Sequence, residues 1–219
     1  MLVLAIDTAT PEVVTGVVEV TDDAGPTVLS QRSELTTRGH AEILTTRILE
    51  CLTEAGVTRG DLDAVVVGQG PGPFTGLRVG LATGAAFADA LGIPVHGICS
   101  LDAIAVQESD VGSLLVVTDA RRREVYWARY ERGVRTHGPH VLAPGELAEE
   151  LSGEDIDAAA GSAAHTSLFG YPTRTATAPT AQALVQVAVP NLIASVVPGP
   201  LTPLYLRRPD AVELKDRKK

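Results

Sequence analysis

The pattern of apolar and polar positions divides the first hundred residues into short strands and two longer helices. Apolar runs bounded by turn residues predict strands, and apolar residues that recur every three or four positions predict helices. The predicted elements, in chain order, are strands at 2–7, 13–20 and 27–33, a helix at 40–55, a strand at 63–69, a helix at 75–91 and a strand at 94–99. Their order is βββαβαβ.

A similar order returns in the second half of the chain. The predicted elements there are a short helix at 101–106, strands at 113–119, 124–131 and 134–142, a helix at 145–151, a strand at 156–161, a weak helix, a strand at 173–177 and a helix at 181–188. In both halves the first strand ends in an aspartate, Asp7 or Asp119. We therefore predict a duplicated α/β fold with a cleft between two lobes, at 1–100 and 101–219, and right-handed crossovers within each lobe.

Composition narrows the class of protein. Among the 219 residues, 45% are hydrophobic but only 4% are aromatic, which favours buried strands and helices packed through aliphatic side chains. A net charge of −9 argues against unaided binding to nucleic acid. Cys51 and Cys99 lie in apolar contexts and predict buried, reduced thiols. Without a signal peptide or a charge-free run that could cross a membrane, we expect a soluble cytoplasmic protein.

The stretch GQGPGPFTGLRVGLATG at 68–84 has the glycine content of a phosphate-binding loop. A P-loop, however, needs a lysine next to the second glycine, and the first lysine of this chain is Lys215. Pro71 and Pro73 also remove two backbone N–H donors that a phosphate cradle would use. The stretch therefore predicts a strand-to-helix turn, with Thr75 as the helix N-cap.

The helix after this turn carries a stripe of small residues. Gly76, Gly80, Gly84 and Ala88 recur every four positions and share one helical face. Each glycine costs a helix roughly 1 kcal/mol relative to alanine, so a close approach of another backbone must offset that cost. The rest of the helix is nearly all apolar, which predicts burial on several sides. One side covers the chain's own sheet. The pattern leaves open whether the other side covers a neighbouring helix or a partner molecule.

The same stretch carries a resemblance to a known family. Together with VLAIDTAT (3–10), His40-Ala-Glu42, DARRREVYWARYE (119–131) and PLYLRRPDAV (203–212), it resembles the TsaB (YeaZ) family over nearly the whole chain. The resemblance implies the actin-, Hsp70- and sugar-kinase-like fold, built from two ribonuclease-H-like βββαβα lobes, of which the second is degenerate here.

The resemblance also implies a function. It implies a non-catalytic scaffold and dimerisation subunit of the complex that forms threonylcarbamoyladenosine at position thirty-seven of tRNAs reading ANN codons. Its partners would be the catalytic paralogue TsaD, the small ATPase TsaE and, when alone, a second copy. ATP and metal would belong to those partners, and tRNA would be touched only through the complex. With the first two helices as the contact, the predicted interface comprises Ile48, Cys51, Gly76, Leu77, Gly80, Leu81, Gly84, Phe87 and Ala88.

A vestigial nucleotide cleft is predicted at Asp7, Thr10 and Asp119, because kinase-like relatives hold magnesium and phosphate with such aspartates. The bulky run Arg121–Arg123 after Asp119 lacks glycine, which favours a cleft that no longer binds nucleotide. That run could also contact tRNA or an acidic partner. The five histidines form no H-x-x-x-H or H-E-x-x-H pair, so we predict no metal site. A free-standing ATP-binding enzyme or a peptidase of the same fold, and a homodimer with a separate role, are the alternatives.

Overall fold

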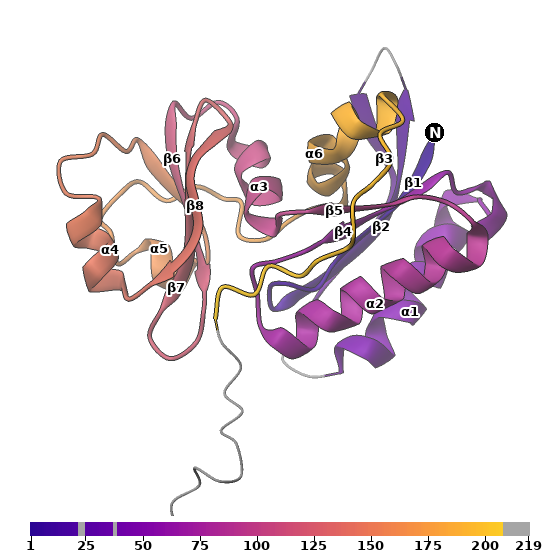
Figure 1. Ribbon diagram of the computed structural model, residues 1–219, viewed down its shortest axis with the longest axis horizontal. Helices are drawn as coiled ribbons and strands as arrows, with labels where there is room; N and C mark the ends of the chain where they lie inside the picture. Colours follow the sequence, from indigo (N-terminus) through magenta and orange to yellow (C-terminus); the bar gives the residue numbers. More distant parts are fainter. Residues whose placement is uncertain (22–24, 37–38, 208–219) are drawn as a thin grey trace, which may run out of the picture.

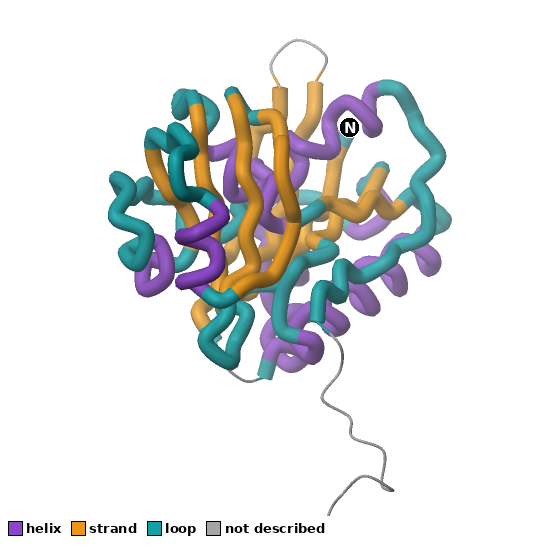
Figure 2. The backbone as a smooth tube through the Cα atoms, turned by 60° about the vertical axis from the view of Figure 1, so that its left-hand side comes forward, coloured by secondary structure: helices purple, strands orange, loops and turns teal. Residues whose placement is uncertain are grey.

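The computed structural model describes residues 1–21, 25–36 and 39–207, and it consists of two mixed sheets side by side, each covered by helices (Figures 1 and 2). Residues 208–212 of the closing motif lie outside the described residues. Among the described residues, no helix combines the length and the apolar character needed to cross a membrane.

The first sheet has the strand order β3-β2-β1-β4-β5. The first three strands pair antiparallel, whereas β4 and β5 run parallel to β1. This sheet comprises β1 (Leu2–Asp7), β2 (Glu12–Thr21), β3 (Gly25–Leu35), β4 (Ala64–Gly68) and β5 (Val95–Ile98). The predicted strands are therefore confirmed, within a few residues at their ends.

Helices cover both faces of this sheet, which explains why β1 is apolar at successive positions. Leu4 and Ile6 point into a core shared with α1 (His40–Ala55) and α2 (Phe74–Leu91). Val3 and Ala5 point to the opposite face, into a core shared with α6 (Ala181–Ile193). Side chains alternate between the two faces of a strand, so a strand covered on both faces needs apolar residues throughout.

The position of α6 corrects the predicted division of the chain. Residues 181–188 were predicted as a helix of the second lobe, but α6 packs on β1, β2 and β3 of the first sheet (Figure 1). Its side chains Leu184, Val185 and Leu192 are buried there. The prediction was wrong for this helix because chain order does not reveal that a segment returns to an earlier sheet.

The second sheet repeats the order of the first in a reduced form, β8-β7-β6-β9. Its strands are β6 (Ser113–Asp119), β7 (Val125–Glu131), β8 (Val134–Leu142) and β9 (Ala158–Gly161), and the accompanying helical segments are α3 (Ser100–Ala105), η2 (Val106–Glu108), α4 (Pro144–Glu150) and α5 (Ala163–Thr166). The predicted strand at 173–177 is reduced to a bridge between Ala159 and Thr173. Duplication with a degenerate second copy is thus visible in the topology.

The segment 196–207, called the strap below, connects the two lobes. It runs from α6 across the first lobe to the boundary between the lobes (Figure 1). The Leu204 amide donates to the Gln69 carbonyl oxygen in the first lobe, at 2.8 Å. The Arg207 guanidinium donates to the Ala120 carbonyl oxygen in the second lobe, at 2.6 Å. The strap is therefore bonded to both lobes.

Candidate partner-binding face and interlobe cleft

The glycine-rich turn passes close beneath the end of β1. β4 ends at Gly68 and α2 begins at Phe74, one residue before the predicted N-cap, so the helix is capped by Pro73 instead. At Gly72, a Cβ atom would lie 2.2 Å from the Ala9 carbonyl oxygen, a distance that no side chain tolerates. Glycine is required here because the two backbones touch.

The small-residue stripe of α2 packs on its own sheet. A Cβ added at Gly76 would lie 2.8 Å from the Thr8 carbonyl oxygen, and one at Gly80 would lie 2.4 Å from the Thr8 hydroxyl. At Gly84 it would lie 2.3 Å from Cγ2 of Val67. The Thr8 hydroxyl donates to the Gly76 carbonyl oxygen (2.7 Å) and accepts from the Gly80 amide (3.0 Å). The stripe thus packs on Thr8, which directly follows β1, and on Val67 of β4, and its assignment to a partner interface is wrong.

The predicted interface residues are therefore part of the core of the first lobe. Eight of them are buried, and the ninth is half-buried against the same core. The buried residues are Ile48, Cys51, Gly76, Leu77, Gly80, Leu81, Gly84 and Ala88, and the half-buried one is Phe87. The assignment of the eight buried residues to the interface is corrected, because a residue enclosed by its own sheet cannot reach a partner, whereas half-buried Phe87 stays a predicted interface residue.

A different set of residues forms the outer face of the same two helices. On α1, Ala41, Thr45 and Leu49 are exposed, and Leu49 keeps 46% of its surface accessible. On α2, Ala82 and Ala86 are exposed. Because positions four apart lie on one side of a helix, each set forms a line along its helix. We call these five residues the outer face.

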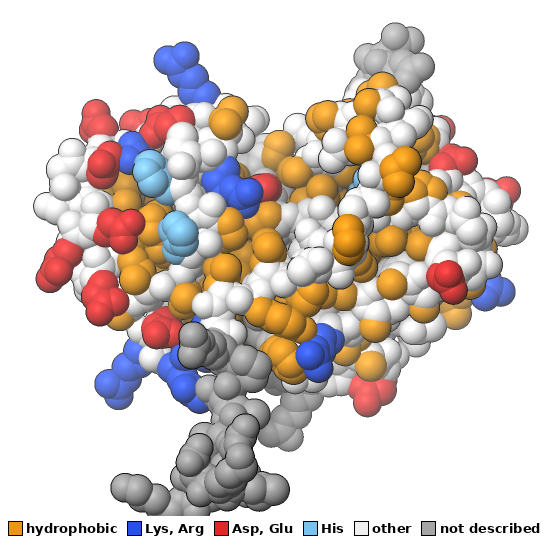
Figure 3. Space-filling model, in the orientation of Figure 1, with side chains coloured by type: hydrophobic (Ala, Val, Ile, Leu, Met, Phe, Trp, Pro, Cys, Tyr) orange, Lys and Arg blue, Asp and Glu red, His pale blue; other side chains and the backbone are white. Residues whose placement is uncertain are grey.

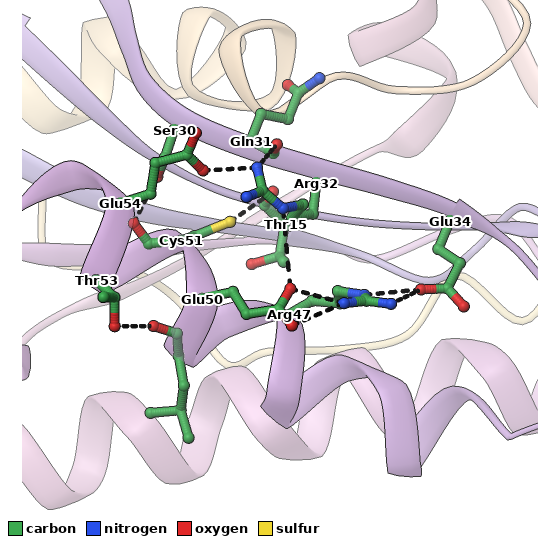
Figure 4. Close-up of polar contacts among 11 residues, drawn as sticks. Thr15, Ser30, Gln31, Arg32, Glu34, Arg47, Glu50, Cys51, Thr53 and Glu54 are labelled. Atoms are coloured by element: carbon green, nitrogen blue, oxygen red, sulfur yellow. Dashed lines mark hydrogen bonds and ion pairs between the residues drawn. The ribbon is translucent and has the colours of Figure 1, made fainter.

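Charged residues of α1 lie at the border of the outer face, where they pair with β3. Arg47 bonds Glu34 of β3 and Glu50 of its own helix, each at 2.7 Å (Figure 4). Arg32 of β3 bonds Glu54 of α1 at 2.6 Å (Figure 4). These pairs join Arg47 and Glu54 to β3 at the edge of the outer face, whereas Glu42 of α1 is exposed next to Ala41.

The charge at the start of α2 is held by aromatic rings. The Arg78 guanidinium lies 3.7 Å from the ring centroid of Phe74, and its Nε donates to the Tyr205 hydroxyl of the strap at 2.8 Å. The Phe74 and Tyr205 rings stack at 4.9 Å.

Uncharged groups cover most of the visible first lobe, whereas acidic side chains gather on the second (Figure 3).

In the predicted cleft, Asp7 is enclosed by protein. Its side chain is fully buried and accepts hydrogen bonds from the Ser100 hydroxyl (2.5 Å) and the Ala9 amide (2.9 Å). Burial raises the pKa of Asp7 to about 6, although these hydrogen bonds oppose the shift. A Cβ atom on Gly68 would lie 1.7 Å from Oδ2 of Asp7, so the carboxylate packs directly against the Gly68 backbone. Asp7 thus joins β1 to the start of α3 and presents no free oxygen to a ligand.

The second aspartate, Asp119, is held by the hairpin that follows it. It accepts from the Arg121 amide at 2.7 Å, pairs with the Arg121 guanidinium at 3.4 Å and lies 3.7 Å from the His165 ring. Arg121, Arg122 and Arg123 all have left-handed backbones, with φ of 62°, 51° and 64°. Residues other than glycine rarely adopt this backbone conformation, so the hairpin is strained.

Where the lobes meet, a cavity of about 470 Å³ remains. Thr8, Thr10, His40 and Thr75 of the first lobe line it, together with Arg121 of the second. Thr10, the third predicted cleft residue, is buried, and its hydroxyl accepts from the Glu12 amide at 3.2 Å. Thr10 and Arg121 therefore line the cavity, whereas Asp7 does not.

Among the described residues, no group of three or more His, Cys, Asp or Glu side chains is placed to hold a metal ion. Both cysteines are free and buried, as their apolar contexts predicted.

Comparison with known proteins identifies the fold class. A family model described as "TsaD: tRNA N6-adenosine threonylcarbamoyltransferase" matches residues 28–194. The solved structure of YeaZ from Pseudomonas aeruginosa superposes with a TM-score of 0.77 at 25% identity, over 94% of this chain and 99% of that one. EutJ from Carboxydothermus hydrogenoformans, at 12% identity and a TM-score of 0.54, shares the fold alone. The class is thus the two-lobed actin-, Hsp70- and sugar-kinase-like fold.

Two sequence relatives refine that class. An uncharacterized protein of Mycobacterium tuberculosis is 52% identical over 97% of this chain and 94% of its own length. The Escherichia coli protein named tRNA threonylcarbamoyladenosine biosynthesis protein TsaB is 32% identical over 74% of this chain and 72% of its own length. The chain belongs to the TsaB/YeaZ family.

Proposed function

We propose that this chain takes part in forming threonylcarbamoyladenosine in tRNA, as a non-catalytic subunit that binds a TsaD-type transferase. Family membership and the name of the E. coli relative support the pathway. The contact would be the outer face of α1 and α2, which replaces the buried residues predicted from the sequence.

The observation that carries the proposal is the chemistry of the outer face. Ala41, Thr45, Leu49, Ala82 and Ala86 are small or apolar, exposed and uncharged. Small side chains allow a second pair of helices to approach closely, and exposed apolar surface rimmed by polar groups is typical of an interaction site. The ion pairs of α1 with β3 form one such rim.

The non-catalytic part of the proposal is supported by the cleft. The Asp7 carboxylate is bonded to Ser100 and enclosed, so it cannot coordinate a magnesium–nucleotide complex without breaking that contact. Asp119 is followed by a strained arginine hairpin in place of a phosphate-binding turn. The work of the subunit would then be to hold its partner in an active conformation.

The binding test substitutes exposed alanines, because a substitution at an exposed position leaves the folded structure intact. Ala86→Arg places a long charged side chain in the middle of the outer face. We expect it to abolish co-elution with the TsaD protein of the same organism in size-exclusion chromatography. The matched control is Ala148→Arg, at an exposed alanine of α4 in the second lobe. Should Ala86→Arg bind TsaD as well as the control does, the outer face is not the interface.

The functional test separates binding from catalysis. In cells that lack this protein, wild type and Asp7→Asn should both restore threonylcarbamoyladenosine in bulk tRNA, measured by mass spectrometry of nucleosides. Ala86→Arg should fail to do so. If Asp7→Asn fails although it folds and binds TsaD, the cleft has a catalytic role and the scaffold proposal is wrong.

The same face would pair two copies when no partner is present. Sedimentation equilibrium of the chain alone should show a dimer that Ala86→Arg dissociates and that added TsaD replaces. A dimer unaffected by Ala86→Arg would place self-association elsewhere.

A further inference from the structure

A second cavity, of about 430 Å³, lies where β1, β4 and β5 begin. It is on the α6 side of the first sheet, opposite the face covered by α1 and α2. Its walls include Leu192, Val196 and Val197, from the end of α6 and the strap, and Met1 and Asp63 lie at its rim. It is therefore independent of the partner-binding proposal.

The distinctive group in this cavity is His96. Its neighbour Val95 packs in the core under α1 and α2, so alternation along β5 turns His96 toward α6. The side chain is 6% exposed and lines the cavity. No hydrogen bond or ion pair joins it to another residue in the part of the chain that the structure describes.

The His96 imidazole lines the cavity, and its ring nitrogens are not among the enclosed side-chain atoms without a partner. A neutral imidazole offers one N–H donor and one acceptor nitrogen, and both are without a protein partner among the described residues. Burial lowers the pKa of His96, which favours this neutral form. The histidine would be satisfied by a polar atom that enters the cavity.

Two other polar groups at the cavity rim, Asp63 and the Met1 ammonium, are bonded to protein, and Ser195 also lines the cavity. Asp63 Oδ2 accepts from the Leu2 amide at 2.6 Å, and the Met1 ammonium donates to the Val20 carbonyl oxygen at 3.0 Å. The remaining walls are largely apolar, and Val196 keeps 46% of its surface exposed at the mouth. Apolar walls with a small number of polar groups, here His96 and Ser195, are the usual composition of a small-molecule site, and the volume lies within the range of such sites.

We propose that this cavity binds a compact, mostly apolar molecule with one neutral hydrogen-bonding group, a hydroxyl or a ring N–H, that pairs with His96. The site differs in place from the interlobe cleft, which is lined by several threonines together with His40, Glu42 and Arg121. No charge on the ligand is needed, because the group that it meets is neutral.

The test compares two probes of the same shape, phenol and toluene, of which only phenol carries a hydroxyl. Each is titrated into the full chain while the methyl resonances of Leu192 and Val196 are followed by NMR. Both probes should shift these resonances saturably. In His96→Leu, the preference for phenol over toluene should fall about threefold to tenfold relative to wild type, the range of one hydrogen bond.

A second variant keeps the test decisive if His96→Leu does not fold. Val196→Trp, at a half-exposed position, fills the mouth of the cavity and should weaken both probes at least tenfold. Val134→Trp, at a 68% exposed position on β8, is the matched control and should change neither affinity. The proposal is overturned if neither probe binds, if His96→Leu leaves the phenol preference unchanged, or if Val196→Trp binds as well as its control.

Discussion

Helix α2 has two faces made of small residues, and they meet different surroundings. On the inner face, Gly80 and Gly84 lie so close to Thr8 and Val67 that a Cβ atom would clash at 2.4 Å or less. On the outer face, Ala82 and Ala86 are exposed. A periodic stripe of small residues therefore indicates that something approaches closely, but it does not identify the approaching segment.

The two faces also differ in what each small residue contributes. An inner glycine costs the helix roughly 1 kcal/mol relative to alanine. That cost is offset where the Thr8 hydroxyl bonds two backbone groups of α2 and where the helix covers the buried strand β4. An outer alanine is a strong helix former and leaves its surface free. Stability depends on the first face, and the proposed partner binding depends on the second.

The largest expected effect comes from placing the same side chain on each face. Gly80→Arg forces a charged chain against Thr8 and the buried sheet, so we expect the free energy of unfolding to fall by more than about 4 kcal/mol. Ala86→Arg should change it by less than about 0.5 kcal/mol. Urea denaturation followed by circular dichroism measures both. Equal losses in the two variants would contradict the division into an inner and an outer face.

The next largest effect concerns the buried carboxylate of Asp7, at the end of β1. Its pKa is raised from 3.8 to about 6 in the folded protein, so its contribution to stability is fully present below 3.8 and is lost as the pH rises through 6. Lowering the pH from 8 to 5 should therefore stabilise wild type relative to Asp7→Asn by about 1.4 kcal/mol.

Urea denaturation of both proteins at the two pH values measures this shift. The difference between them isolates Asp7, because other titrating groups are shared. A stability difference that does not change with pH would mean that Asp7 is not enclosed as the structure has it.

The smallest effect concerns the strap, which borders the outer face through Tyr205. Arg207→Ala removes the hydrogen bond to Ala120 and the ion pair with Glu124, whose groups lie 3.0 Å apart. Because both side chains are partly exposed, we expect a loss of about 1 kcal/mol.

Hydrogen exchange of the amides in the hairpin at 120–124 should become faster in Arg207→Ala, since the strap no longer holds that hairpin. Arg59→Ala, at an exposed arginine of the 3₁₀ segment Arg59–Asp61, is the control. If both variants lose the same stability and the hairpin amides exchange as in wild type, the strap does not connect the lobes energetically.

Much of the fold was predictable from the sequence. The strands at 2–7 and 63–69 and the helices at 40–55 and 75–91 follow from their apolar periods, and the structure confirms them. The repeat was also predictable, because each copy begins with a strand that ends in an aspartate. The TsaB/YeaZ resemblance, carried by the stretch at 68–84, is confirmed by relatives and solved structures.

The candidate sites were predicted less well. Ile48 and Cys51 are apolar in the sequence whether they face a sheet or a partner, and only their burial separates the two cases. Leu49 has no sequence signal that separates it from the other apolar residues of 40–55, and only its 46% exposure makes it part of the outer face. His96 gave no motif, since an isolated histidine on a short strand is indistinguishable from a satisfied core residue.

The sequence by itself determined most of the elements, their order, the duplication and the family, because local periodicity and motif spacing are properties of neighbouring residues. The tertiary structure alone decided which side of α2 meets the sheet, that α6 returns to the first lobe, and that Asp7 is enclosed. Those outcomes depend on contacts between residues far apart in the chain, such as Thr8 with Gly80 and Asp7 with Ser100. No local pattern encodes such contacts, since many pairings satisfy the same apolar faces.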